Sequence, residues 1–505
     1  MRVMWMLIGC VLLSTHVQAN DFKKRFEEFR TYQQVSFDST RSEQQKAYDE
    51  FRRQQNAQYV AQLRENWQEY PLSDVLQPIE KNSIMPTDYR QTIVTSTAGE
   101  IEENTPLITN TSILYLPEKT PQPQPMVPIQ PKPQEEEVVS IALYGTLISI
   151  AFPKDADLHL RGVDEYNISK LWEQIADTIV PNKFDNTLAS CLSKRRHMNL
   201  CDWAYLQMVK AISNRRYGNS NEATIFAAYL MAQSGYKIRL AYTDTRIYLL
   251  IASQHEIYGM SRYKVENEWY YMVDGYGISS CFISNAGLRE EHKLSLFIFD
   301  ELKIDAEPSD IVYATSSQGW SLPIQVNTNL IDFYDGYPAC RVFNGDESSK
   351  WLIAVNTPLD AVAKQTLYPH ILDSIRHLTP WAATAMILNW VQTAFRYELD
   401  NNVWGNDRVF FSEETLYYPR SDCEDRAILF TTLVRDILGL DVLLLCYENP
   451  YHVATAVHFP VEEAYGKYVM HDGKRYMVCD PTFANASIGQ EMPEYKYSQA
   501  QIIVP

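Results

Sequence analysis

Apolar residues near the end of the chain follow first a helical and then a strand-like spacing. Behind residue 423 they recur every three or four positions, at Ala427, Phe430, Val434 and Ile437. This spacing predicts one apolar helix face, and Gly439 predicts the end of the helix. The short apolar segments 441–447, DVLLLCY, and 451–459, YHVATAVHF, predict two strands.

A hairpin is expected next. YVM at 468–470 and RYMVCD at 475–480 flank the sequence HDGK, and its Asp472-Gly473 pair is a strong turn signal. The C-terminal region therefore predicts a helix followed by antiparallel strands, which indicates an α+β fold.

Residues 20–70 show a longer helical pattern. They are rich in Glu, Arg, Gln and aromatic residues, and FEEFR at 26–30 recurs as YDEFR at 48–52. Apolar positions fall at helical spacing, at Phe22, Phe26, Phe29, Val60, Leu63 and Trp67. We expect two helices that pack on the body of the protein, and the alternative is an arm that binds a partner.

Residues 71–137 are expected to form a linker. Its last part, 119–137, alternates proline with polar residues and then turns acidic, which is typical of an extended, poorly packed tether across the surface. The segment 138–152, VVSIALYGTLISIAF, predicts strands, and the rest of the chain has the mixed pattern of a globular protein.

The first 19 residues indicate export. One arginine, an apolar run and the small-residue end Val17-Gln18-Ala19 predict a signal peptide at 1–19. LIGC at 7–10 also resembles a lipobox, so a lipid anchor on Cys10 is the second possibility. The apolar run is too short for a transmembrane helix. We expect a periplasmic or extracellular protein without a transmembrane span.

Length, charge and cysteine content narrow the function. A chain of 505 residues predicts two or three domains, and its net charge of −18 argues against binding nucleic acid through phosphates. Seven cysteines remain after Cys10, at positions 191, 201, 281, 340, 423, 446 and 479. Cys191 and Cys201 are close enough in sequence to pair. An odd number in an exported protein suggests one thiol left over, and Cys423 is the best candidate.

Charged residues surround Cys423, whereas a structural cysteine usually has apolar neighbours. At a helix N-terminus, the macrodipole and the unbonded backbone N–H groups favour a thiolate and could hold an oxyanion. We therefore expect a thiol pKa below the free value of about 8.5. His452 begins a later strand and Asp480 ends another. His458 lies roughly 20 Å beyond His452 along the strand, too far to serve the same site.

Helix with Cys, strand with His, next strand with Asp is the order found in the transglutaminase-like superfamily of papain-type cysteine enzymes. DCEDRA, the histidine that opens a strand and the strand end DPT resemble its three motifs, over about residues 380–490. The resemblance implies that Cys423 is a nucleophile, His452 a general base and acid, and Asp480 the group that orients His452. The residue two before the cysteine is often glycine in this family, whereas here it is Ser421.

The long loop 397–419 is rich in aromatic residues. Its Trp404 either forms a wall of the substrate cleft or anchors the loop. We expect no cofactor and no metal ion, because the chain has no close ligand pair such as C-x-x-C and no dense acidic loop with calcium-type spacing. The plain alternative is a buried cysteine, a core histidine and a strand-end aspartate without a joint role.

An earlier segment resembles a second, degenerate copy of this region. Residues 217–242 align with 418–447 when Gly235 is matched to Gly439. Asn219 then lies opposite Cys423, with Ser220 and Asn221 as near-equal alternatives, and no choice restores a cysteine. Tyr248 lies opposite His452, and Asp274 lies opposite Asp480. The similarity could also be chance between two α/β segments.

These patterns predict two transglutaminase-like, papain-like lobes: a degenerate domain at 138–300, a β-rich connection at 301–345 and a catalytic domain at 346–505. The expected function is a secreted cysteine hydrolase that cleaves peptide or isopeptide amide bonds in a peptide or protein substrate, with cell-wall and surface proteins among the candidates. The alternatives are a protein-crosslinking acyl transferase and a catalytically silent binding scaffold.

Overall fold

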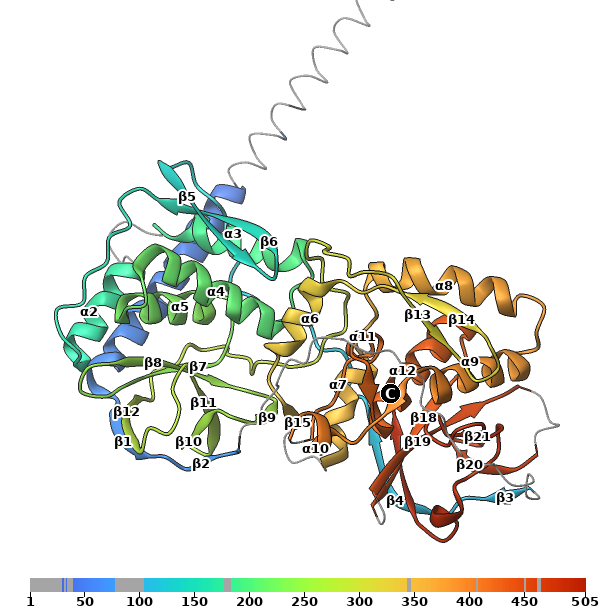
Figure 1. The fold of residues 1–505 in the computed structure, drawn as a ribbon. Coiled ribbons are helices and arrows are strands. Elements are labelled where there is room, and N and C mark those ends of the chain that lie inside the picture. Colours follow the sequence, from blue (N-terminus) through green and yellow to red (C-terminus); the bar gives the residue numbers. More distant parts are fainter. Residues whose placement is uncertain are drawn as a thin grey trace, which may run out of the picture.

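The computed structural model describes residues 30, 33, 40–77, 104–176, 183–342, 347–405, 407–448, 451–460 and 465–505. These residues form two lobes that lie side by side (Figure 1). The fold is α+β, as predicted, with one curled sheet in each lobe. The predicted signal peptide, the lipobox cysteine Cys10 and the repeat FEEFR lie outside the described residues.

The first lobe begins with a hairpin and continues through helices to a sheet. The hairpin and helices are β5 (Glu136–Leu143), β6 (Thr146–Pro153), α2 (Glu165–Ala176), α3 (Asp185–His197), α4 (Asp202–Tyr217) and α5 (Asn221–Gln233). The sheet strands that follow are β7 (Ile238–Tyr242), β8 (Ile247–Ala252), β10 (Ser261–Val265), β11 (Glu268–Val273) and β12 (Ser280–Ser284), and β9 (His255–Ile257) lies outside this sheet.

The second lobe repeats this order. It begins with β13 (Val312–Thr315), β14 (Ser321–Ile324), α6 (Thr328–Asp335), β15 (Cys340–Val342), η1 (Glu347–Lys350), α7 (Trp351–Val355), α8 (Ala361–Ile375) and α9 (Pro380–Ala394). The long loop carries β16 (Arg396–Tyr397), α10 (Asp400–Val403), α11 (Ser412–Tyr417) and β17 (Arg420–Ser421). Then come α12 (Cys423–Leu433), η2 (Val434–Leu438), β18 (Val442–Glu448), β19 (Tyr451–His458), β20 (Lys467–His471), β21 (Lys474–Cys479), η3 (Pro493–Tyr495) and β22 (Ala500–Val504).

The two sheets have the same strand order. The first is β2-β10-β11-β8-β7-β12-β1, with β2 (Asp74–Val75) and β1 (Trp67–Pro71) at its edges. The second is β3-β20-β21-β19-β18-β22-β4, with β3 (Thr105–Pro106) and β4 (Thr109–Tyr115) at its edges. In each lobe one helix packs on the two central strands, α5 on β7 and β8 and α12 on β18 and β19. The hairpins also correspond, since β5 and β6 contact α4 and α3 while β13 and β14 contact α9 and α8. The fold is therefore duplicated within the chain.

The outer strands of both sheets come from the N-terminal region. β1 (Trp67–Pro71) pairs with β12 and β2 (Asp74–Val75) with β10, while β3 (Thr105–Pro106) pairs with β20 and β4 (Thr109–Tyr115) with β22. The prediction that 71–137 is only a linker is therefore wrong, because β2, β3 and β4 in this segment form edge strands of the two sheets. Short edge strands carry little alternation of apolar residues, so the sequence pattern does not reveal them.

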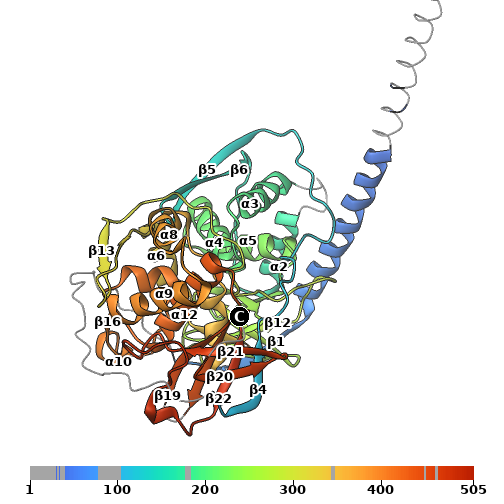
Figure 2. The ribbon, with the colours of Figure 1, turned by 90° about the vertical axis from the view of Figure 1, so that its right-hand side faces the viewer.

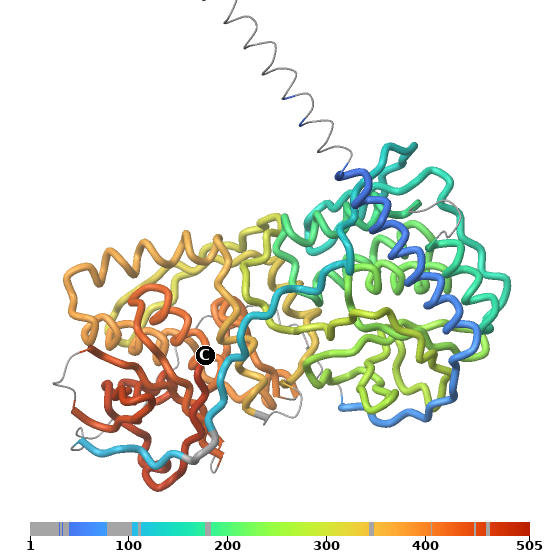
Figure 3. The backbone as a smooth tube through the Cα atoms, turned by 180° about the vertical axis from the view of Figure 1, so that it is seen from behind, coloured from blue at the N-terminus to red at the C-terminus, as the bar shows by residue number. Residues whose placement is uncertain are grey.

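The proline-rich segment crosses the surface in an extended form without regular secondary structure, as predicted, but it is not poorly packed. After β4 it passes from the second lobe to the first (Figure 3). Arg195 donates a hydrogen bond to the carbonyl of Pro123 at 2.7 Å, and the backbone N–H of Lys132 donates to Asn186 at 2.7 Å. We call residues 119–135 the strap.

A helix over residues 40–65, here called the N-terminal helix, lies along the first lobe (Figures 2 and 3). Val60 and Leu63 are buried, and each buried side chain of this type stabilises the fold by roughly 1.5–3 kcal/mol. Arg52 forms a buried ion pair with Asp185 at 2.6 Å. The helix thus packs on the body of the protein, and it ends before Trp67, which begins β1 instead of continuing the predicted helix.

The segment 301–345 is only partly the β-rich connection that the sequence predicted. Its β13–β14 hairpin packs on α8 and α9 and so belongs to the second lobe, and it also contains helix α6. β15 pairs with β9 and joins the two lobes.

All seven cysteines after Cys10 are buried and carry free thiols, so Cys191 and Cys201 are not paired although their closeness in sequence would allow it. Among the described residues, none of the helices has both the length and the apolar character needed to cross a membrane.

Candidate active site

Cys423 is the first residue of α12, as the apolar pattern predicted, and its side chain is buried. The helix starts here because Asp422 takes the N-cap position in an extended conformation. The Asp425 carboxylate accepts hydrogen bonds from the backbone N–H groups of Asp422 at 3.2 Å and Phe410 at 3.0 Å. It therefore holds both the start of the helix and the middle of the long loop.

His452 and Asp480 are in direct contact. His452 is the second residue of β19, Asp480 directly follows β21, and these strands are paired. The Nε2 atom of His452 lies 2.8 Å from Oδ2 of Asp480, and both side chains are buried. The other carboxylate oxygen accepts hydrogen bonds from the backbone N–H groups of Thr482 at 2.9 Å and Phe483 at 3.1 Å. Asp480 is thus held rigidly against the imidazole.

Aromatic rings also hold the imidazole in place. The ring of Tyr495 stacks on it with centroids 4.8 Å apart and planes at 21°. Burial alone would lower the pKa of His452, but the charge and hydrogen bond of Asp480, with a smaller contribution from Glu424, raise it above the ordinary value. The paired imidazole is thus more easily protonated than a free one.

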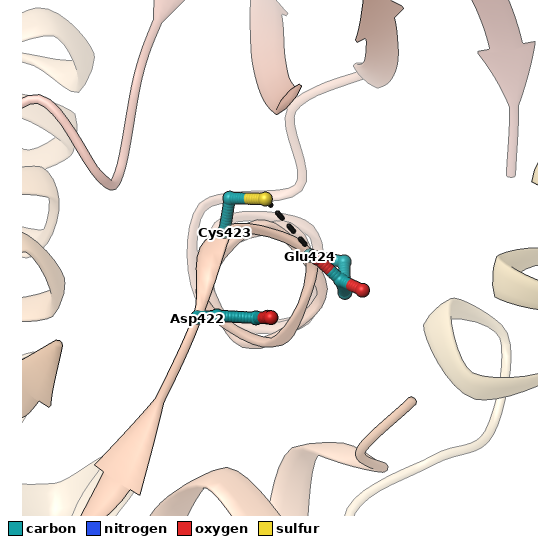
Figure 4. Close-up of side chains that lie close together, drawn as sticks. All are labelled: Asp422, Cys423 and Glu424. Carbon is teal, nitrogen blue, oxygen red and sulfur yellow. Dashed lines mark hydrogen bonds between the residues drawn. The ribbon is translucent and has the colours of Figure 1, made fainter. Parts of the chain in front are cut away.

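The thiol of Cys423 is turned toward Glu424. Its sulfur lies 3.1 Å from Oε2 of Glu424 (Figure 4), and the described residues contain no hydrogen bond between Cys423 and His452. The backbone N–H of Val453, the residue after His452, does lie within hydrogen-bonding reach of the sulfur. The thiol and the imidazole are therefore near neighbours on α12 and β19 without being bonded to each other.

Burial and the carboxylates of Glu424 and Asp422 raise the pKa of the Cys423 thiol well above its ordinary value. The prediction of a lowered pKa is therefore wrong for this arrangement. The helix N-terminus favours a thiolate, but a buried sulfur beside two carboxylates experiences a stronger opposing effect. In this arrangement the thiol form of Cys423 is therefore favoured over the thiolate.

Trp404 is buried inside the long loop. Its ring makes edge contacts with Phe410 and Tyr418, at centroid distances of 5.7 and 5.1 Å, and the guanidinium of Arg408 lies 4.5 Å from its centre. These contacts favour the loop anchor over the wall of a substrate cleft. His458, at the far end of β19, bonds to the carbonyl of Arg475 and takes no part in the site, as its spacing predicted.

In the first lobe, the residues that align with Cys423, His452 and Asp480 also lie close together, but their side chains differ in chemistry. Asn219, Tyr248 and Asp274 line one small pocket of about 30 Å³. Asp274 pairs with Lys210 at 2.7 Å, which occupies the carboxylate that would otherwise orient a base. Because α5 starts at Asn221 and α12 at Cys423, the helix starts favour Asn221 as the counterpart of the cysteine, one of the alternatives left open by the sequence.

A cavity of about 330 Å³ lies between the lobes. Its lining includes Tyr258 of the first lobe together with Tyr337, Cys340, Ile353, Asp407 and Phe411. The carboxylate of Asp407 also lies within 4.8 Å of that of Glu424, which connects the cavity to the surroundings of Cys423. Sequence reasoning missed this cavity because its walls come from segments as far apart in the chain as Tyr258 and Phe411.

No protein-family model matches the chain, and the search of curated proteins found no match either.

Proposed function

We propose that the protein is a cysteine hydrolase that cleaves peptide or isopeptide amide bonds, with Cys423, His452 and Asp480 as its catalytic residues. The observation that carries the proposal is the buried His452–Asp480 pair beside the helix N-terminus that bears the cysteine. An imidazole fixed by a carboxylate next to a thiol is the arrangement that activates a nucleophile.

The proposed reaction begins when substrate displaces the Glu424 side chain from the sulfur. Asp480 engages Nε2 of His452, so Nδ1 is left to take the thiol proton. The sulfur attacks the amide carbonyl, and the imidazolium returns the proton to the leaving amine. Water then hydrolyses the thioester with His452 as the base. Backbone N–H groups at the N-terminus of α12 favour the negative charge that develops on the oxygen.

The cavity between the lobes is the proposed site for a side chain of the substrate. Its walls are mainly apolar and aromatic, with Asp407 at the end nearest Glu424. We therefore expect a preference for an apolar side chain next to the scissile bond.

The test is to trap acyl adducts on Cys423 by mass spectrometry with a library of peptide amides. A millimolar lysine analogue is added so that hydrolysis and transfer to an amine compete. We expect free acid as the main product, and mainly amine adduct would make the protein a crosslinking transferase. His452→Ala should abolish the adduct, whereas His458→Ala, on the same strand, should not. The absence of any adduct on the wild-type cysteine would refute the hydrolase.

A further inference from the structure

One buried side chain outside the proposed triad reaches the backbone of Asp480. Gln392 lies near the end of α9 and is 1% exposed. Its Nε2 atom donates hydrogen bonds to the carbonyl of Asp480 at 2.9 Å and to the carbonyl of Ala486 at 3.1 Å. These two bonds hold both ends of the loop 480–486, which follows β21.

The amide of Gln392 supplies donors that this buried loop needs. Asp480 and Ala486 are both buried, and buried backbone carbonyls require hydrogen-bond donors. The NH2 group of a glutamine offers two donors without adding a charge. The Oε1 atom of Gln392 is buried and has no hydrogen-bond partner among the described residues, so the side chain contributes through its NH2 group.

The contact fixes Asp480 without occupying its carboxylate. Oδ2 remains available to Nε2 of His452 at 2.8 Å, and Oδ1 to two backbone N–H groups of the loop. Helix α4 of the first lobe reaches the counterpart Asp274 in another way, because Lys210 pairs with the carboxylate itself at 2.7 Å. Such an ion pair competes with an imidazole, whereas the bond from Gln392 does not.

The same end of α9 is also bound to the helix that carries Cys423. Arg426, three residues after the cysteine, is 1% exposed. It donates to the backbone carbonyl of Gln392 at 2.9 Å and to that of Phe395 at 2.7 Å. A guanidinium at the C-terminal end of a helix satisfies carbonyls that the helix leaves unbonded. One short segment of α9 therefore contacts both α12 and the loop that begins with Asp480.

We propose that Gln392 is a positioning residue that sets the place of Asp480, and through it the place of His452, relative to the thiol of Cys423. Its catalytic meaning rests on the proposed function. The described residues contain no hydrogen bond between the thiol and the imidazole, so their relative position depends on the elements that carry them. Without the amide, two buried carbonyls lose their donor, and the loop shifts to find others. That shift loosens the contact between Asp480 and the imidazole.

The test is Gln392→Met in the full chain, because methionine has a similar size and no N–H donor. The pKa of His452 is measured by NMR of isotopically labelled histidine, and urea unfolding checks the fold. We expect the pKa of His452 to fall, because the imidazolium loses part of its contact with the carboxylate. In the acyl-adduct assay, adduct formation should slow by at least about tenfold. Binding of the peptide amide should stay within a few-fold, since Gln392 does not line the cavity between the lobes.

Trp390→Phe is the matched control on the same helix. Trp390 is buried, and its Nε1 atom donates to the carbonyl of Ala314 in β13 at 3.0 Å. Phenylalanine removes this buried bond but leaves the loop 480–486 untouched. The variant should therefore lose stability without a change in the pKa of His452.

If Gln392→Met does not fold, Gln392→Asn replaces it, because the shorter side chain keeps an amide but cannot reach both carbonyls together. An unchanged pKa of His452 in the folded variant overturns the proposal, and so does an equal fall in Trp390→Phe. The NMR measurement needs no substrate, so it separates this proposal from the hydrolase. A lower pKa of His452 without any acyl adduct on wild-type Cys423 would support the positioning role and refute the hydrolase alone.

Discussion

Asp480→Asn is the substitution that most directly tests the paired imidazole. Asparagine keeps the size of aspartate and can still accept hydrogen bonds from the backbone N–H groups of Thr482 and Phe483. It removes the negative charge that lies against Nε2 of His452 and replaces the accepting oxygen there by an NH2 donor. The fold should therefore persist while the electrostatic environment of the imidazole changes.

The size of the effect follows from the geometry. Two unit charges about 4 Å apart attract by about 4 kcal/mol at an effective dielectric constant of about 20. Both groups are buried, so solvent screens this attraction little. In Asp480→Asn the imidazolium should lose up to this amount of electrostatic stabilisation. Burial already disfavours the charged form of His452, so the pKa of His452 should then fall.

The change should also appear in the pH dependence of stability. The folded pKa of His452 is raised above its unfolded value of about 6.5, so its protonation stabilises the wild-type fold fully below that pH. This contribution is lost as the pH rises through the raised folded pKa. Asp480→Asn should remove this contribution of His452 protonation. Relative to wild type, the variant should therefore lose the most stability below about pH 6.5.

The assay is an NMR titration of isotopically labelled histidine, with the His452 signal assigned by its absence in His452→Gln. Urea unfolding at several pH values gives the matching free energies. Asp472→Asn is the control, because it removes an exposed carboxylate beside a different histidine, His471. An unchanged or raised pKa of His452 in folded Asp480→Asn would refute this account of the pair.

Three further predictions concern the rest of the fold. Gly235→Ala would place a Cβ 2.3 Å from a backbone oxygen of the strap, whereas the Cβ of Gly439→Ala, also at positive φ, meets open space. In urea unfolding, Gly235→Ala should lower the free energy of unfolding by about 1–3 kcal/mol more than Gly439→Ala does. Equal losses would contradict the close packing of the strap. Asp185→Asn leaves the buried arginine of the N-terminal helix unpaired and should cost about 3–5 kcal/mol. The exposed control Asp300→Asn should cost at most about 1 kcal/mol, and similar values for both would argue against a packed helix. Tyr248→Ala should leave turnover of a small substrate within a few-fold, and complete loss in a folded variant would assign bond chemistry to the first lobe.

Several features of the protein could be predicted from the sequence alone because they depend on local spacing. The apolar stripe after Cys423 predicted that this residue lies at or just before the start of a helix, and the turn signal at Asp472-Gly473 predicted the hairpin of β20 and β21. The order of Cys423, His452 and Asp480 on successive elements was sufficient to nominate them as one candidate site. Internal similarity also predicted the duplication that the two matching strand orders display.

Other features were decided only by tertiary contacts. The edge strands β1 to β4 have too few alternating apolar residues to be recognised in the sequence. They form because they pair with sheet strands far along the chain. The direction of the thiol pKa depends on how Glu424 is turned toward the sulfur, which no spacing rule contains. Gln392 meets the carbonyl of Asp480 because α9 packs against the loop that follows β21. Electrostatic effects depend on distance and burial, and both are set by the folded chain rather than by separation in sequence.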